Sequence, residues 1–253
     1  TAEAAAIIAD LEDARQSPFV SGVVLRIDSP GGDVYASELI WRAVRRLAQV
    51  KPVIASLGDV AASGGYYVAS AAPTILAMPN TITGSIGIFT LKPNLEGLYK
   101  LLEVHTQTLK VGPHADWDSL SQGFSDAVRL RVQRRLRIYY DDFVARVSLG
   151  RSMLLSEVYQ KAQGRVYTGA QALSLGLIDA LGGLNDAIEE LKARLDVASD
   201  QKLLVEFPSR PPALASVIAN LASGSQSLAV TLKQSVQRLT AWEDKALALW
   251  PYS

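Results

Sequence analysis

The most informative feature of the chain is Gly58-Asp59-Val60-Ala61-Ala62-Ser63-Gly64-Gly65-Tyr66-Tyr67. It places one serine, Ser63, on a turn of small residues. Residues 51–57, just before it, form a short apolar run that is typical of a buried strand. Residues 66–72, just after it, contain no helix breaker before Pro73, so a helix can begin at the serine. The stretch therefore predicts a strand, a tight turn and a helix.

Two interpretations of this turn are open from the stretch alone. A serine at the start of a helix, flanked by glycines, can expose its hydroxyl while backbone N–H groups face a developing oxyanion. The same small residues can instead serve only to let the helix pack close to the strand. The first interpretation makes Ser63 a candidate nucleophile, and the second gives it no chemical role.

The surrounding sequence predicts an α/β fold. Residues 22–28 and 74–78 are expected to be strands, and residues 37–49 a helix between strands. Strands that alternate with helices at a spacing of about 25 residues are typical of parallel βαβ units. Further helices are expected over residues 4–15, 125–149, 154–163, 170–175 and 184–195, and a further strand over residues 203–207.

The expected organisation is one domain with an appendage. Residues 1–200 form the predicted domain, and residues 201–253 a C-terminal strand and helical appendage, with helices expected over 213–253. The chain opens on a predicted helix with no strand before it. We therefore expect it to be a fragment of a longer protein.

Composition excludes several classes of function. The 253 residues are 49% hydrophobic, so a sizeable core can form. The 25 basic and 25 acidic residues cancel, which argues against a nucleic-acid partner. The chain has no cysteine, so it has neither disulfides nor a thiol nucleophile. It also has no histidine pair at the spacing of metal ligands, so no metal site is expected.

Two further loops of small residues can contribute to a site. Ser29-Pro30-Gly31-Gly32-Asp33 follows the first predicted strand, and its paired glycines allow backbone N–H groups to approach a ligand closely. Thr83-Gly84-Ser85-Ile86-Gly87 follows the third predicted strand, and Ser85 there can hydrogen-bond a catalytic base. Either loop can also be an ordinary turn.

Ser63 needs a base, because a free serine hydroxyl is a poor nucleophile near neutral pH. A triad with a histidine and an aspartate is one arrangement, and a lysine with a pKa lowered by burial is another. The alternative for all of these side chains is an ordinary surface role. By position, the candidates within the chain are His105, His114, Asp116, Asp118, Lys92 and Lys110.

Together, the three loops closely resemble the signal peptide peptidase A family of serine proteases. Gly164-Arg165-Val166-Tyr167-Thr168-Gly169, Ala172, Gly176-Leu177-Ile178-Asp179 and Gly182 fit the same family further along the chain. The resemblance covers residues 4–195. It implies a Clp/crotonase-like fold and a serine protease with a Ser–Lys dyad, and it implies no cofactor.

The resemblance also assigns roles to residues. Ser63 would be the nucleophile and Ser85 would orient the lysine. Gly64 and the turn formed by Gly31 and Gly32 would donate to the oxyanion. The substrate would be remnant signal peptides at the extracytoplasmic (periplasmic) face of the cytoplasmic membrane. Family members resemble oligomeric bowls, and this chain would reach the membrane through a segment outside it.

One position departs from the family pattern. The short form of the family has its lysine where this chain has Ala115, within Gly112-Pro113-His114-Ala115-Asp116. Either the chain resembles the C-terminal half of the long form, whose N-terminal half supplies the lysine, or alanine replaces the lysine in an inactivated variant. We favour the first explanation and expect the isolated chain to be a poor protease.

Two other functions remain open from the sequence. A crotonase-like acyl-CoA enzyme would share the fold and an oxyanion hole without needing Ser63. A non-catalytic scaffold half would only complete the site of a partner. A caseinolytic-type protease would need a histidine near Ser85, and the sequence has none there.

Overall fold

Strand β2 (Val53–Ala62) is the centre of a six-stranded sheet in the computed structural model, which describes residues 2–112, 115–198, 201 and 203–208. Its first half pairs in parallel with β1 (Val23–Ser29) on one side and with β3 (Thr74–Ala77) on the other. Its last residues pair in parallel with β4 (Ile82–Gly84). Because β1 also pairs with the end of β2, strands β3 and β4 follow one another along the opposite edge.

A bulge in β2 changes its direction before Ser63. The register runs from Ile27 opposite Leu57 to Ser29 opposite Ala61, so β2 has extra residues at this point. The carboxylate of Asp28 accepts a hydrogen bond from the N–H of Val60 (3.1 Å) across the bulge. Bulges bend and twist a strand, and this one carries the end of β2 to the turn that follows β1.

Beyond β3 and β4, the sheet ends in two short strands, whereas β1 forms the opposite edge. β5 (Val166–Thr168) pairs antiparallel with β4, and β6 (Ala180–Leu181) pairs parallel with β3. The sequence analysis predicted neither of them, and it treated β4 as part of a loop. Strands of two or three residues carry no recognisable period, so tertiary pairing alone defines them.

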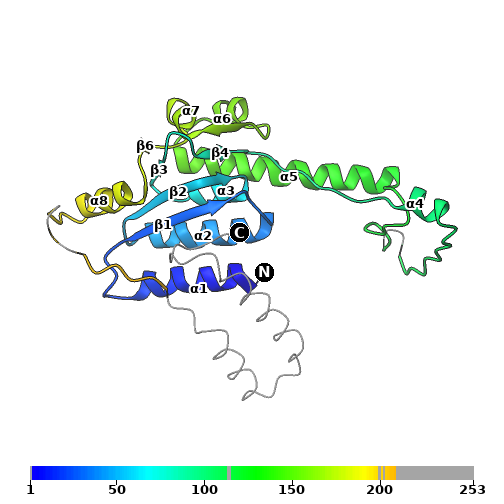
Figure 1. Ribbon diagram of the computed structural model, residues 1–253, viewed down its shortest axis with the longest axis horizontal. Coiled ribbons are helices and arrows are strands. Elements are labelled where there is room, and N and C mark those ends of the chain that lie inside the picture. Colours follow the sequence, from blue (N-terminus) through cyan, green and yellow to red (C-terminus); the bar gives the residue numbers. More distant parts are fainter. Residues whose placement is uncertain (1, 113–114, 199–200, 202, 209–253) are drawn as a thin grey trace, which may run out of the picture.

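Helices cover both faces of the sheet (Figure 1). The main core lies between the sheet and the helices α1 (Ala2–Gln16), α2 (Val34–Ala48) and α3 (Gly64–Ala69). A smaller cluster lies on the other face under α8 (Leu184–Arg194), where Ile54 and Leu76 contact Ala187 and Leu191. β2 is therefore buried on both faces, as its long apolar run requires.

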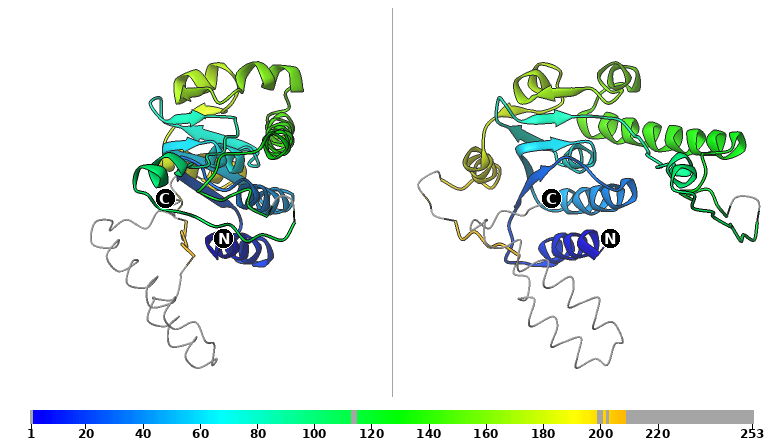
Figure 2. Two further views of the ribbon diagram at one scale, coloured as in Figure 1. Left: turned by 90° about the vertical axis from the view of Figure 1, so that its right-hand side faces the viewer. Right: turned by 45° about the vertical axis from the view of Figure 1, so that its right-hand side comes forward.

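The long helix α5 (Asp126–Arg151) projects beyond the sheet (Figures 1 and 2). Its second half packs on the body through Phe143, Val144 and Val147, while Ile138 is 60% exposed. Residues 89–112 and 115–124, here called the arm, run out along α5 and include α4 (Glu96–Leu101) at the far end. α6 (Leu155–Lys161) and α7 (Gly169–Ser174) follow α5.

The structure confirms the expected Clp/crotonase-like α/β fold with parallel βαβ units. The strand expected at 203–207 is wrong: these residues are irregular, because the described strands of the sheet pair with one another and not with this segment. The expected helical appendage over 213–253 lies outside the described residues, and the division into two parts stays a prediction. No described helix combines the length and apolar character that a membrane crossing requires.

We predict that Gly150→Ala lowers the free energy of unfolding by about 2 kcal/mol, the usual range for overpacking. A Cβ at Gly150 in α5 would overlap the backbone carbonyl of Ser70, so α5 would have to move away from α3. Gly97→Ala in α4 is the matched control, because nothing lies within 4 Å of its added Cβ. Denaturant unfolding measures both, and equal stability of the two variants would contradict the prediction.

Candidate active site

Ser63 occupies a strained backbone position at the junction of β2 and α3. Its φ is 50° and its ψ is −118°, a region that non-glycine residues rarely adopt. The N–H of Ser63 donates to the carbonyl of Gly84 (2.9 Å), and its carbonyl accepts from Tyr67 (2.8 Å). Its hydroxyl makes no capping bond with α3. Strain of this kind costs about 1–3 kcal/mol and clusters at functional sites.

The turn after β1 lies directly against Ser63. Gly31 has a φ of 121°, which favours glycine. A Cβ added to Gly31 would lie 2.8 Å from the Cβ of Ser63 and 3.2 Å from its Oγ. Glycine at this position therefore leaves the space next to the serine hydroxyl open.

The glycines after Ser63 pack against the same turn. A Cβ on Gly64 would lie 2.6 Å from the Oγ of Ser37 and 3.1 Å from the backbone nitrogen of Gly32. A Cβ on Gly65 would lie 2.8 Å from the carbonyl oxygen of Ser29. The backbones of the two glycine turns are thus in contact, and only residues without side chains allow this approach.

Two backbone amides are available beside Ser63. Gly64 is the first residue of α3, so its N–H has no acceptor within the helix. Within the described part of the chain, the N–H of Gly32 has no acceptor either. The N–H of Gly31, by contrast, donates to the Oγ of Ser29 (3.2 Å). Of the turn residues singled out from the sequence, Gly32 and Gly64 therefore offer donors, whereas Gly31 provides clearance.

Ser85 lies close to the same edge of the sheet. It follows Gly84, whose carbonyl accepts the hydrogen bond from Ser63. It also has a positive φ (49°), and its N–H donates to the carbonyl of Arg165 (2.7 Å). Ser85 therefore directly follows the residue that accepts the backbone hydrogen bond from Ser63.

A cavity of about 190 Å³ lies between α1, β1, α2 and α3, bordered by both glycine turns. Its apolar walls include Ile27, Ile40 and Val68, each at most 5% exposed. Charged residues at its lining are Glu3, Arg26 and Asp33. The cavity is mostly apolar, and the amides of Gly32 and Gly64 lie at its border.

The structure does not bring the candidate bases of the arm to Ser63. Lys110 forms an ion pair with Asp116 (2.7 Å), and this bond together with one from Gln122 lowers the pKa of Asp116 to about 2. The Nζ of Lys92 lies 4.7 Å from the centre of the Phe124 ring, next to the start of α5. Figures 1 and 2 show this end of α5 far from α3.

Of the other candidates named from the sequence, those that the structure describes supply no base to Ser63. His105, Ala115 and Asp118 are exposed in the arm, and His114 lies outside the described residues. The Nζ of Lys92 is buried over the Phe124 ring and has no hydrogen-bond partner among the described residues. The other described lysines have partners elsewhere, which are the carbonyls of Ala14 and Ser17 for Lys51, Glu96 for Lys100, Asp116 for Lys110, Met153 for Lys161 and Glu189 for Lys192. Among the residues that the structure describes, no group of acidic and histidine side chains is placed to hold a metal ion.

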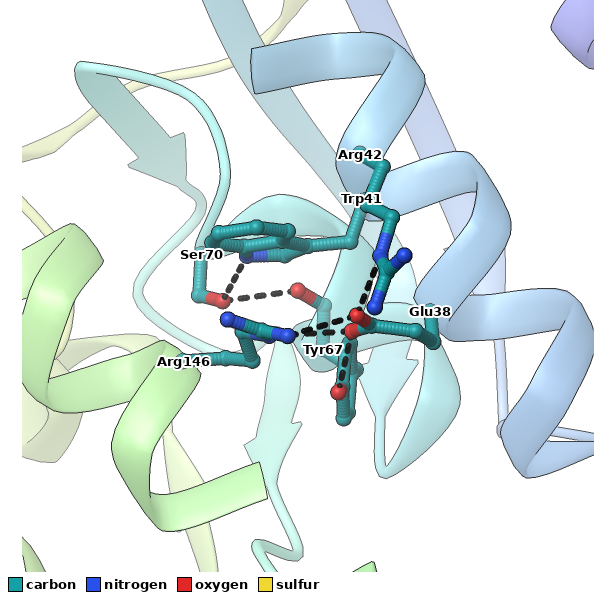
Figure 3. A network of polar contacts seen from close by, with 6 residues as sticks. All are labelled: Glu38, Trp41, Arg42, Tyr67, Ser70 and Arg146. Atoms are coloured by element: carbon teal, nitrogen blue, oxygen red, sulfur yellow. Dashed lines mark hydrogen bonds and ion pairs between the residues drawn. The ribbon is translucent and has the colours of Figure 1, made fainter. Parts of the chain in front are cut away.

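A polar network beside the site was missed by the sequence analysis (Figure 3). The carboxylate of Glu38 on α2 accepts hydrogen bonds from the hydroxyl of Tyr67 on α3 (2.7 Å) and from Nε and Nη2 of Arg146 on α5 (3.0 and 2.6 Å). Nε of Arg42 on α2 donates a fourth hydrogen bond to this carboxylate (2.6 Å). These residues are more than 100 positions apart at the extremes, so no local pattern reveals their contact.

The network holds Glu38 in its charged form. Burial raises the pKa of Glu38, but the hydrogen bonds from Arg146, Tyr67 and Arg42 outweigh it, so the pKa lies below the ordinary value. Burial and the bond to Glu38 raise the pKa of Tyr67, which keeps its hydroxyl protonated as the donor. Glu38 therefore stays charged and Tyr67 stays protonated over the physiological pH range, so the charge-assisted hydrogen bond between them persists.

The fold and these side chains define the site of a Clp/crotonase-like protein, in which a serine lies beside two backbone N–H donors. Residues 45–198 match peptidase family S49. Serine protease SPPA, chloroplastic, of Arabidopsis thaliana is 37% identical over 94% of this chain and 35% of its own length. A Synechocystis protein named as a protease is 38% identical over 72% of this chain and 69% of its own length.

An Enterococcus faecium protein whose name includes signal peptide peptidase SppA is 34% identical over 73% of this chain and 54% of its own length. The chain belongs to peptidase family S49, and the resemblance to the signal peptide peptidase A family is confirmed. The chain spans about a third of the length of the plant relative.

We predict that Gly31→Ala destabilises the protein by about 2 kcal/mol, through its positive φ and its contact with Ser63. Gly32→Ala, one residue away, has nothing within 4 Å of its Cβ and should change stability by less than about 0.5 kcal/mol. Thermal and denaturant unfolding of both variants check this. A Gly32 variant as unstable as the Gly31 variant would refute it.

A second prediction concerns Glu38 and pH. Because the pKa of Glu38 is lowered in the folded state, its charge stabilises the fold fully above the ordinary value of 4.5, and this contribution is lost as pH falls through the folded-state pKa. The difference in unfolding free energy between wild type and Glu38→Gln should therefore shrink on acidification. Denaturant unfolding between about pH 2 and pH 7 measures it, and a difference that does not change with pH would disprove the assignment.

Proposed function

We propose that this chain is the nucleophile-bearing part of a serine endopeptidase. The observation that carries the proposal is Ser63, strained at the start of α3, with the amides of Gly32 and Gly64 beside it. This arrangement suits a hydroxyl that attacks a peptide carbonyl while two N–H groups receive the negative charge on its oxygen. Membership of peptidase family S49 supports this chemistry.

The proposed reaction proceeds through an acyl-enzyme. A neutral lysine amine takes the proton from the Oγ of Ser63 as the Oγ–carbon bond forms, and the carbonyl oxygen becomes an oxyanion bound by Gly32 and Gly64. The lysine then gives the proton to the leaving amine, and the peptide bond breaks. A water molecule, deprotonated by the same lysine, hydrolyses the ester and restores Ser63.

The lysine is proposed to come from outside this chain. Lys92 is buried against Phe124 near the start of α5, and the other described lysines have partners elsewhere. The family position of the lysine is held by Ala115, on the arm. The fraction of the plant relative that this chain spans is compatible with a lysine-bearing N-terminal half of a long form. Ser85, near Gly84, is proposed to orient the incoming lysine by a hydrogen bond.

The proposed substrates are remnant signal peptides. The apolar cavity at the glycine turns suits an apolar side chain next to the cleaved bond. The name of the Enterococcus relative supports this substrate class. We further propose an oligomer that acts at the extracytoplasmic face of the cytoplasmic membrane, attached through a segment outside this chain.

The first prediction of this proposal concerns labelling by a fluorophosphonate, followed by intact mass. The isolated chain should label slowly, because its serine lacks a base, whereas the chain together with the lysine-bearing half should give a single adduct that Ser63→Ala abolishes. The expected gain in labelling rate is at least about 100-fold, the usual contribution of a general base.

The isolated Ala115→Lys chain is the control for the competing explanation. Rescue by this substitution without the upstream half would mean that the chain is an inactivated short form, and the shared dyad would be wrong. Rapid labelling of the isolated wild-type chain would equally contradict an external base.

The second prediction concerns the cavity. Ala36→Leu would fill part of it and should lower kcat/KM for peptides with a large apolar residue before the cleaved bond by about tenfold relative to peptides with alanine. Val68→Ala would enlarge the cavity and should shift the ratio in the opposite direction. Competition between two such peptides measures the ratio, and a ratio unchanged in both variants would place the substrate elsewhere.

A further inference from the structure

We propose that Glu38 is a positioning residue that fixes the separation of the Gly32 and Gly64 amides by joining α2, α3 and α5. The inference rests on the proposed function, because it assumes that these amides receive the oxyanion. Glu38 itself touches neither the serine nor the amides in the structure. Its effect would act through the two helices that carry the glycine turns.

Each oxyanion amide is attached to one of these helices. Gly32 precedes Asp33, the N-cap of α2, whose carboxylate accepts the N–H of Ala36 (2.8 Å). Gly64 is the first residue of α3. Ser37 on α2 packs against Gly64, so a shift of α2 relative to α3 changes the distance between the two amides.

Glu38 links the same helices about one turn from the amides. Its carboxylate binds the hydroxyl of Tyr67, which is the fourth residue of α3. The side chain of Glu38 is only 16% exposed, and that of Arg146, its partner on α5, is 28% exposed. Charge-assisted, bidentate hydrogen bonds such as that between Arg146 and Glu38 fix the geometry of two side chains more tightly than single neutral hydrogen bonds do.

A second side-chain contact joins α2 to the end of α3 about one helical turn further along. The indole N–H of Trp41 donates to the Oγ of Ser70 (3.2 Å), which in turn donates to the carbonyl of Tyr67 (2.7 Å). The guanidinium of Arg146 lies 4.6 Å from the centre of the Trp41 ring. Figure 3 shows Arg146 facing both Glu38 and Trp41, so α5 contacts α2 at the two residues that also bind Tyr67 and Ser70.

The physical consequence is specific to the transition state. A displacement of one amide by a fraction of an ångström weakens the bonds to the oxyanion, which exists only during reaction. It leaves the ground-state contacts of the substrate with the cavity largely unchanged. Loss of the Glu38 contacts should therefore lower kcat and spare KM.

The test uses the full-length protein with peptide substrates and a peptide aldehyde, whose adduct with a serine carries an oxyanion. Glu38→Gln keeps the size of the side chain but removes its charge, and Tyr67→Phe removes only the hydroxyl that reaches α2. We expect each to lower kcat and the affinity for the aldehyde by about tenfold, with KM within about twofold, which is less than the loss of a whole oxyanion donor. Arg137→Ala, which breaks an exposed ion pair on α5 with Asp141, is the matched control.

Wild-type kcat and aldehyde affinity in both variants would overturn the positioning role. So would a loss that active-site titration traces entirely to unfolded protein, or a change confined to KM. If the Glu38→Gln variant does not fold, the kinetics of the Tyr67→Phe variant alone test the positioning role. Fluorophosphonate labelling of the full-length wild type distinguishes failure of the proposed function from failure of the positioning role. If Ser63 is not labelled, both the proposed function and the positioning role of Glu38 are wrong. If Ser63 is labelled normally and the variants keep wild-type kinetics, only the positioning role is wrong.

Discussion

The backbone contact between two glycine turns determines how the elements around Ser63 are arranged. The turn after β1 and the start of α3 approach until their backbones touch, so side chains are excluded at Gly31, Gly64 and Gly65. The bulge in β2, held by Asp28, brings these turns together. The contact leaves two glycine amides at the border of an apolar cavity with the hydroxyl of Ser63 beside the turn, and the proposed chemistry uses all of them.

The elements around this contact hold it from outside. The strained Ser63 is fixed by its bond to Gly84 on β4, and α2 and α3 are tied to α5 through Glu38. α5 itself is anchored at its C-terminal end, where Arg151 forms two bonds with the carboxylate of Asp179 (2.7 and 2.9 Å). Backbone strain persists only where the surroundings enforce it, and these bonds form such surroundings.

The sequence predicted the fold class, the main helices and three buried strands, because each has a strong local pattern. It also singled out Ser63 and the glycine turns, since paired glycines next to a predicted strand end are visible locally. The short strands β5 and β6 depend on tertiary pairing and left no such pattern. The Glu38–Arg146 contact joins residues 108 positions apart, and the choice between Gly31 and Gly32 as donors needed the bond from Gly31 to Ser29.

A crystal structure of the full-length protein with a peptide aldehyde bound to Ser63 would show both the oxyanion site and the base. We expect the oxyanion to lie about 2.7–3.1 Å from the nitrogens of Gly32 and Gly64. We also expect the lysine within hydrogen-bond distance of the Oγ of Ser63 to belong to a segment outside residues 1–253. An oxyanion bound by other groups, or a base supplied by Lys92 or Lys110, would contradict the proposed mechanism.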